Sequence, residues 1–171
     1  EIIEMGDDLP DGTVIDGELL VYNKNKIGSF NDLQKRLGRK KVGKTILEKY
    51  PVILKSYDLL ENNQKDIRNE TYLFRRSLLE LLIINVKNNY LQLSPFHTIQ
   101  NWSELENAHQ KARENRSEGL MIKRKNESYK VGRKKGDWWK WKVNPLTIDA
   151  VLTYAMRGHG RRANLFTDYT F

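Results

Sequence analysis

The segment from Asp137 to Val143 (DWWKWKV) constrains the fold most, because lysines and apolar side chains alternate along it. Successive side chains of a β-strand point to opposite faces, so Lys140 and Lys142 share one face and apolar side chains fill the other. The two ammonium groups would lie only about 7 Å apart. Because like charges repel, this pattern favours an anion such as phosphate between them, although an edge strand protected by lysines has the same pattern.

The rest of the chain alternates further strands with helices and contains no internal repeat. Apolar runs, turn residues and helical periodicity set the expected boundaries. We expect strands over 13–23, 52–60, 91–93, 119–124, 137–143, 147–156 and 166–171, and helices over 30–37, 71–86 and 102–116. Mostly antiparallel strands with packed helices predict an α+β fold.

Three local signals refine the expected helices. The apolar stripe of the helix over 71–86 is predicted to contain Phe74, Leu78, Leu81 and Leu82. Ser29 is expected to cap the first helix. The Ser103-x-x-Glu106 pattern has the form of a capping box and is expected to open the third helix.

Asn144-Pro145 interrupts the pattern between two predicted strands, and we place a domain boundary there. Residues 1–145 would form the larger part of one domain, and residues 146–171 the start of a second. About 25 residues are too few to build a domain core by themselves. We therefore expect the chain to be a piece of a longer protein.

Charge is distributed unevenly around a net value of +8. Residues 111–142 contain twelve basic residues against four acidic ones, and residues 35–44 contain six basic residues and no acidic one. Such patches attract a nucleic-acid backbone, although lysine-rich surfaces also serve solubility alone. The absence of cysteine excludes disulfides, iron–sulfur clusters and zinc fingers. No apolar run is long enough to span a membrane, so we expect a cytoplasmic protein with no membrane association.

Four residues are candidates for ligand binding on chemical grounds. Asp16 and Glu18 lie two residues apart in a predicted strand, so their carboxylates share a face that can bind Mg²⁺ or ribose hydroxyls, or simply contact solvent. Glu118 opens an otherwise apolar strand and needs a partner, which is either a metal ion or a lysine. Tyr57 offers an aromatic face for a purine, or belongs to the core.

The order of four short segments resembles that of motifs III, IIIa, IV and V of the covalent nucleotidyltransferases. The segments are IDGEL (15–19), SYDLLE (56–61), SEGLMIK (117–123) and WWKWK (138–142). FNDLQKRLGRK (30–40), Tyr129-x-x-Gly132-Arg133 and the residues after Trp141 are similar to bacterial ATP-dependent DNA ligases. The resemblance implies an antiparallel-sheet nucleotidyltransferase domain, truncated at its N-terminus and followed by the first strands of an OB-fold.

By that resemblance, the protein would use ATP and Mg²⁺ and would act on nicked duplex DNA as a monomer. Glu18 would contact the ribose or a metal-bound water, Tyr57 would stack on adenine, and Glu118 would help to hold Mg²⁺. Lys140 and Lys142 would contact the α-phosphate, in agreement with the alternation of their strand.

Further basic residues acquire roles through the same resemblance. Lys134 would also contact the nucleotide, although many relatives carry an arginine at that position. The residues expected to contact DNA are Arg36, Arg39, Lys40, Lys41 and Arg133.

Two parts of the family pattern are missing from the sequence: the motif of the nucleophilic lysine and the sixth, lysine-containing motif of the OB domain. The nucleophilic lysine of the family lies in a Lys-x-Asp-Gly motif upstream of the Asp-Gly-Glu strand, whereas the first lysine here is Lys24, downstream of that strand. We therefore expect these residues to be inactive alone, and the parent protein to seal nicks through lysyl-AMP and DNA-adenylate intermediates. A noncatalytic DNA-binding module derived from a ligase is an alternative, as is an RNA ligase or capping-type enzyme.

Overall fold

The computed structural model describes residues 1–132, 134–145 and 147–171 and confirms the α+β class. Its helices are α1 (Ile2–Asp7), α2 (Phe30–Gln34), α3 (Lys44–Lys49), α4 (Tyr72–Val86), α5 (Trp102–Lys111) and the short 3-10 helix η1 (Gly160–Arg162). Its strands are β1 (Val14–Asn23), β2 (Lys26–Ile27), β3 (Val52–Asn62), β4 (Lys65–Asp66), β5 (Leu91–Leu93), β6 (Gly119–Lys123), β7 (Trp138–Lys142), β8 (Tyr154–Arg157) and β9 (Phe166–Thr170). Helices α1 and α3 and the two-residue strand β4 were not predicted from the sequence.

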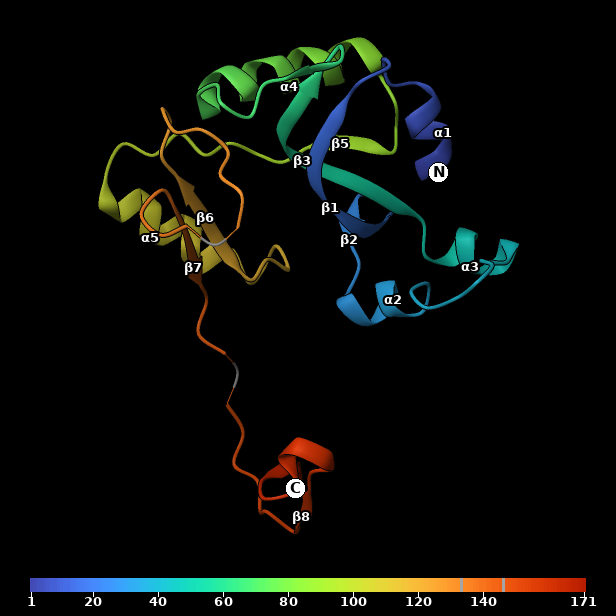
Figure 1. The fold of residues 1–171 in the computed structure, drawn as a ribbon, viewed down its shortest axis with the longest axis vertical. Helices are drawn as coiled ribbons and strands as arrows, with labels where there is room; N and C mark the ends of the chain where they lie inside the picture. Colours follow the sequence, from blue (N-terminus) through green and yellow to red (C-terminus); the bar gives the residue numbers. More distant parts are fainter. Residues whose placement is uncertain (133, 146) are drawn as a thin grey trace.

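The central sheet has the order β2-β1-β3-β4, and β5 pairs in parallel with β3. Figure 1 shows α4 lying across one side of this sheet. The β1–β2 hairpin turns at Lys24 and Asn25, whose φ angles of 49° and 62° suit a tight two-residue turn. The long β1–β3 pairing therefore forms the centre of this sheet, and the shorter strands pair with its two members.

The core of this part lies between α4 and the sheet. Its buried apolar side chains include Leu59, Ile67, Leu79 and Leu82. The predicted apolar stripe of α4 is partly wrong, because Phe74 and Leu81 are 46% and 55% exposed. The buried residues of the helix are Tyr72, Arg75, Arg76, Leu79 and Leu82. The physical reason is Arg75, whose guanidinium faces the sheet and pairs with a buried carboxylate there.

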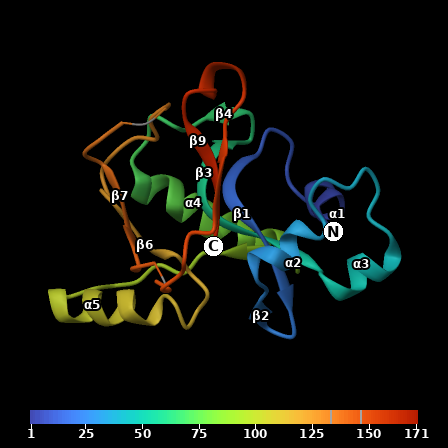
Figure 2. The same cartoon turned by 90° about the horizontal axis from the view of Figure 1, so that it is seen from below.

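β6 and β7 form a separate antiparallel pair, with α5 beside it (Figures 1 and 2). Asn101 caps α5, because its side chain accepts a hydrogen bond from the backbone N–H of Glu104 at 3.0 Å. The capping box predicted at Ser103 is therefore wrong, since that residue already lies within the first turn. The predicted cap at Ser29 is confirmed, as part of a capping box with Asp32.

The β8–β9 hairpin lies apart from the rest of the molecule (Figure 1). The strand predicted over 147–156 is shorter than expected, because the backbone is in strand conformation only from Tyr154. The assignment of residues 146–171 to an OB-fold stays a prediction. Within the described ranges, no helix has both the length and the apolar character needed to cross a bilayer.

Candidate functional site

A β-bulge in β3 places Tyr57. Asp16 of β1 pairs with Asp58, whereas Gly17 pairs with Ser56, so Tyr57 is an extra residue between two paired positions. Bulges bend a strand locally and redirect a side chain. Glycine is required opposite the bulge, because a Cβ on Gly17 would lie 3.0 Å from the Cα of Ser56.

The two carboxylates of β1 have different surroundings. Asp16 accepts a hydrogen bond from the hydroxyl of Tyr129 at 2.8 Å, whereas Glu18 is exposed. Burial, reinforced by the charges of Asp16 and Glu18, raises the pKa of Tyr57 above its ordinary value. The Tyr57 ring is therefore a neutral surface beside two carboxylates, of which Glu18 is the one open to solvent.

Asp58 and Arg75 form a fully buried ion pair between β3 and α4. The guanidinium Nε and Nη2 donate to the two carboxylate oxygens at 2.8 and 2.9 Å. Nη1 donates to the backbone carbonyls of Glu70 and Glu127. Every nitrogen of the guanidinium thus has an acceptor, which is the condition under which a buried charge is tolerated.

Lys123, the last residue of β6, brings a second cation to Asp58. Its Nζ lies 3.8 Å from Asp58 Oδ2, its side chain is 8% exposed, and Nζ has no hydrogen-bond partner among the described residues. The rings of Trp138, Tyr72 and Tyr57 surround it, with their centroids 4.0, 4.7 and 4.8 Å from Nζ. Burial lowers the pKa of Lys123 to about 8, although the charge of Asp58 opposes this shift. We call Asp58, Arg75 and Lys123 the buried cluster.

Lys123 also connects the β6–β7 hairpin to the central sheet, because it contacts Tyr57 and Asp58 of β3. Met121 lies two residues before Lys123 and opposite Lys140 in the β6–β7 register. Cross-strand partners share a face, so Lys140 and Lys142 project from the same face of the hairpin that Lys123 turns toward Tyr57. Lys123 was not identified from the sequence as a site residue; the available signal was a lysine that closes an otherwise apolar strand.

Glu118, Lys140 and Lys142 form a second charged group, which we call the exposed cluster. Glu118 Oε2 lies 3.2 Å from Lys142 Nζ and 3.8 Å from Lys140 Nζ. Lys142, and then Lys140, lower the pKa of Glu118. The anion expected between the two lysines is therefore the chain's own carboxylate. Because all three side chains are more than half exposed, a phosphate group can displace that carboxylate at small cost.

The other residues expected to bind nucleotide or DNA lie outside these clusters. Lys134 is exposed in the loop before β7, and Arg133 lies outside the described residues. Arg36 is engaged within the chain, because it pairs with Glu1 at 2.7 Å and donates to a backbone carbonyl.

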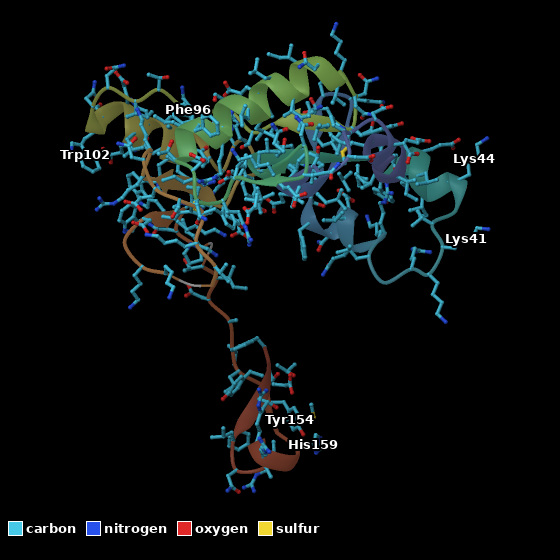
Figure 3. All side chains as sticks on the ribbon, turned by 45° about the horizontal axis from the view of Figure 1, so that its top comes forward. Lys41, Lys44, Phe96, Trp102, Tyr154 and His159 are labelled. Carbon is cyan, nitrogen blue, oxygen red and sulfur yellow. The ribbon has the colours of Figure 1, made fainter. Side chains whose placement is uncertain are left out.

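The remaining basic residues of the loop between α2 and α3 are more open. The Nε of Arg39 donates to the carbonyl of Lys35, and Lys40 and Lys41 are exposed. In Figure 3, Lys41 and Lys44 extend outward from this end of the molecule. Two lysines and one arginine of the predicted DNA contacts therefore remain on an accessible surface.

Glu18 and Glu118 are the predicted magnesium ligands. The described residues contain no group of three or more His, Cys, Asp or Glu side chains arranged to hold a metal ion. Mg²⁺ is usually bound by one or two carboxylates together with substrate phosphates, so a preformed cage is not required. The exposed carboxylate of Glu118 fits that kind of site.

Comparisons with known proteins relate most of the chain to one family. Residues 1–142 match the family described as "ATP dependent DNA ligase domain". A probable DNA ligase from Koribacter versatilis is 30% identical over 92% of this chain and 31% of its own length. The chain thus spans about a third or less of the curated relatives first matched.

Two solved structures share the fold. A mycobacterial DNA ligase D complexed with ATP is 26% identical, with a TM-score of 0.56 over 76% of this chain and 38% of that one. A Lig E DNA ligase, from a study of DNA binding with a minimal scaffold, is 19% identical, with a TM-score of 0.73 over 96% of this chain and 59% of that one. The second likeness concerns the fold alone.

Proposed function

Because the chain belongs to the ATP-dependent DNA ligase domain family, we propose that it forms the nucleotide-binding part of a ligase that seals nicks in duplex DNA. The observation that carries the proposal is the contact of Lys123 with Tyr57. This contact joins the bulged strand β3 to the face of the hairpin that bears Lys140 and Lys142. An aromatic ring and two ammonium groups are then available to one nucleotide.

The proposed nucleotide is ATP, with its base against Tyr57 and its α-phosphate at Lys140 and Lys142. A neutral tyrosine ring suits stacking on adenine, and lysines bind phosphate as point charges. Glu18 is exposed beside Tyr57 and would accept a hydrogen bond from a ribose hydroxyl. Lys134 would add a further contact to the phosphates.

Glu118 and Glu18 are the proposed ligands of Mg²⁺. A phosphate at Lys140 and Lys142 would leave the carboxylate of Glu118 without its lysine partners and therefore open to a cation. When bound, Mg²⁺ would neutralise charge on the phosphates.

In the proposed reaction a lysine amine attacks the α-phosphorus of ATP and pyrophosphate leaves, which gives lysyl-AMP. AMP then passes to the 5′-phosphate at a nick, and the 3′-hydroxyl displaces it as the strands join. Each step is an in-line displacement, so the residues described above serve by positioning the phosphate and balancing its charge. The nucleophile is proposed to come from residues outside these 171.

The proposed DNA contacts are Arg39, Lys40, Lys41 and Arg133, with Arg36 removed because it is engaged within the chain. Their affinity would come from phosphate contacts and would be independent of base sequence. The proposed protein acts as a monomer in the cytoplasm.

An adenylylation assay with α-labelled ATP and Mg²⁺ tests the proposal on this chain and on the same gene extended upstream. Label is expected on the extended protein and not on the 171-residue chain. A matched extended protein carrying Lys140→Gln and Lys142→Gln is expected to lose the label. Label on neither wild-type protein would favour a noncatalytic DNA-binding module, and label on the short chain would show that it contains its own acceptor.

A further inference from the structure

His109 of α5 makes two contacts with β7. Its ring stacks on Trp141, with the ring centroids 4.1 Å apart and the planes 12° from parallel. Its Nε2 lies 3.1 Å from the backbone carbonyl oxygen of Lys142. Because a carbonyl oxygen only accepts, Nε2 must carry the proton in this contact.

Two neighbouring arginines use the same kind of contact. Arg113 donates to the backbone carbonyl of Asn144, just after β7. Arg116, in the turn that follows α5, donates to the backbone carbonyl of Ile27 in β2 at 2.9 Å. Three side chains from one segment thus contact backbone carbonyls at the end of β7, just after β7 and in β2.

The peptide group between Lys142 and Val143 is hydrogen-bonded at both its N–H and its carbonyl. On one side Val143 N donates to the carbonyl of Glu118 at 2.9 Å, and on the other Lys142 O accepts from His109. The stack with Trp141 occupies the face of β7 opposite to the face that bears Lys140 and Lys142. α5 therefore supports the strand from behind and leaves its lysine face open.

We propose that His109 is a positioning residue, which holds the Lys142 ammonium in place for the triphosphate of the nucleotide through its hydrogen bond to the Lys142 carbonyl. The inference rests on the proposed role of Lys142 in phosphate binding. The five β6–β7 register pairs do not involve His109, so loss of this contact shifts the end of the strand and leaves the hairpin paired.

The test is a double-mutant cycle on ATP affinity, measured by calorimetric titration of the 171-residue chain. His109→Phe keeps an aromatic ring on Trp141 and removes the donor, so ATP affinity is expected to fall about threefold to tenfold. His109→Gln keeps a donor and is expected to retain most of the affinity. In the Lys142→Gln background, His109→Phe is expected to cause no further loss.

Four results would overturn the inference. Additive losses in the double variant would mean that His109 acts independently of Lys142. Equal losses in His109→Phe and His109→Gln would mean that the hydrogen bond is not the cause. Unchanged affinity in His109→Phe with weakened affinity in Lys142→Gln would remove the role of His109 alone. If Lys142→Gln itself has no effect, the proposed phosphate contact fails, and the inference fails with it.

Discussion

The buried cluster and the exposed cluster have the same composition of charge, since each places one carboxylate between two cations. Their surroundings differ. In the buried cluster the two members of the main pair are fully buried, whereas the three side chains of the exposed cluster are 52–75% exposed. Lys123 of the first cluster and the two lysines of the second project from one face of the β6–β7 hairpin.

The exposure of each cluster decides whether a ligand can replace its carboxylate. Separating a buried pair leaves an uncompensated charge in a dry environment, so such a pair fixes the geometry around it. Separating an exposed pair costs little, because water and salt replace the lost partner. The buried cluster is therefore suited to hold Tyr57 and the hairpin in register, and the exposed cluster is suited to exchange its carboxylate for a ligand.

The largest expected effect comes from breaking the buried pair. Asp58→Asn would leave Arg75 and Lys123 without a counter-charge and should lower the free energy of unfolding by about 3–5 kcal/mol. Chemical denaturation in urea measures this change. Glu118→Gln is the matched control and should leave the unfolding midpoint unchanged. Equal changes in the two variants would remove the distinction between the clusters.

The second effect concerns ligand exchange at the exposed cluster. Lys140→Gln and Lys142→Gln should each weaken ATP binding about 10-fold to 100-fold, because each removes a charge-assisted contact to phosphate. Calorimetric titration measures the affinity, and Lys44→Gln on α3 serves as the control for a simple change of net charge.

Glu118→Gln should change ATP affinity in opposite directions without and with Mg²⁺. Without Mg²⁺, ATP should bind several-fold more tightly, because the carboxylate no longer competes for Lys140 and Lys142. With Mg²⁺, ATP should bind more weakly if Glu118 holds the cation. A loss of affinity under both conditions would argue against the exchange.

The third effect is the pH dependence of stability due to Lys123. Burial holds its pKa at about 8 in the folded protein, against 10.5 for an unperturbed lysine. Between these values the unfolded chain binds more protons, so stability should rise with pH by up to about 1.4 kcal/mol per pH unit. Below pH 8 both states hold the proton and the contribution is constant.

The usable window for this measurement is about pH 8 to 10, because unfolded tyrosines then begin to ionise. Tyr57 and Tyr129 have raised pKa values in the folded protein, so they reduce stability above that range. Lys123→Met should abolish the rise in urea denaturation profiles, whereas Lys44→Met should keep it. A rise that survives in Lys123→Met would place its origin elsewhere.

Local patterns predicted the longer elements but not the buried cluster. The alternation in β7 and the periodicity of α4 depend on neighbouring residues, so both elements were predicted correctly. The rotation of α4 depends on Asp58, 17 residues before Arg75, and hydrophobic periodicity gives no weight to a buried arginine. The bulge at Tyr57 likewise depends on the β1–β3 register, which cannot be predicted from the sequence of either strand alone.

The exposed cluster was predicted more fully, for a physical reason. Glu118 was expected to need a metal ion or a lysine, and the structure pairs it with Lys140 and Lys142. Charges on exposed strand faces follow the alternation of the strand, because no tertiary contact overrides it. Lys123 obeys the same alternation and was missed, because its burial comes from rings on three other elements.

The smallest expected effect concerns the loop between α2 and α3, which repeats the contrast between engaged and exposed cations. Arg36 is 13% exposed and pairs with Glu1, whereas Lys40 and Lys41 face solvent. Exposed lysines can contact DNA phosphates, and each contact contributes about −0.9 to the slope of log affinity against log salt. An engaged arginine contributes to the fold instead.

Lys40→Gln combined with Lys41→Gln should therefore make the salt dependence shallower by about 1 to 2 units of that slope. Arg36→Gln, the control, should keep the slope and lower the unfolding midpoint, because it breaks a largely buried pair. Fluorescence anisotropy of a nicked duplex, titrated at several salt concentrations, measures both slopes. If Arg36→Gln changes the slope and the lysine pair does not, Arg36 leaves Glu1 to reach the phosphates, and the division into engaged and exposed cations fails at this loop.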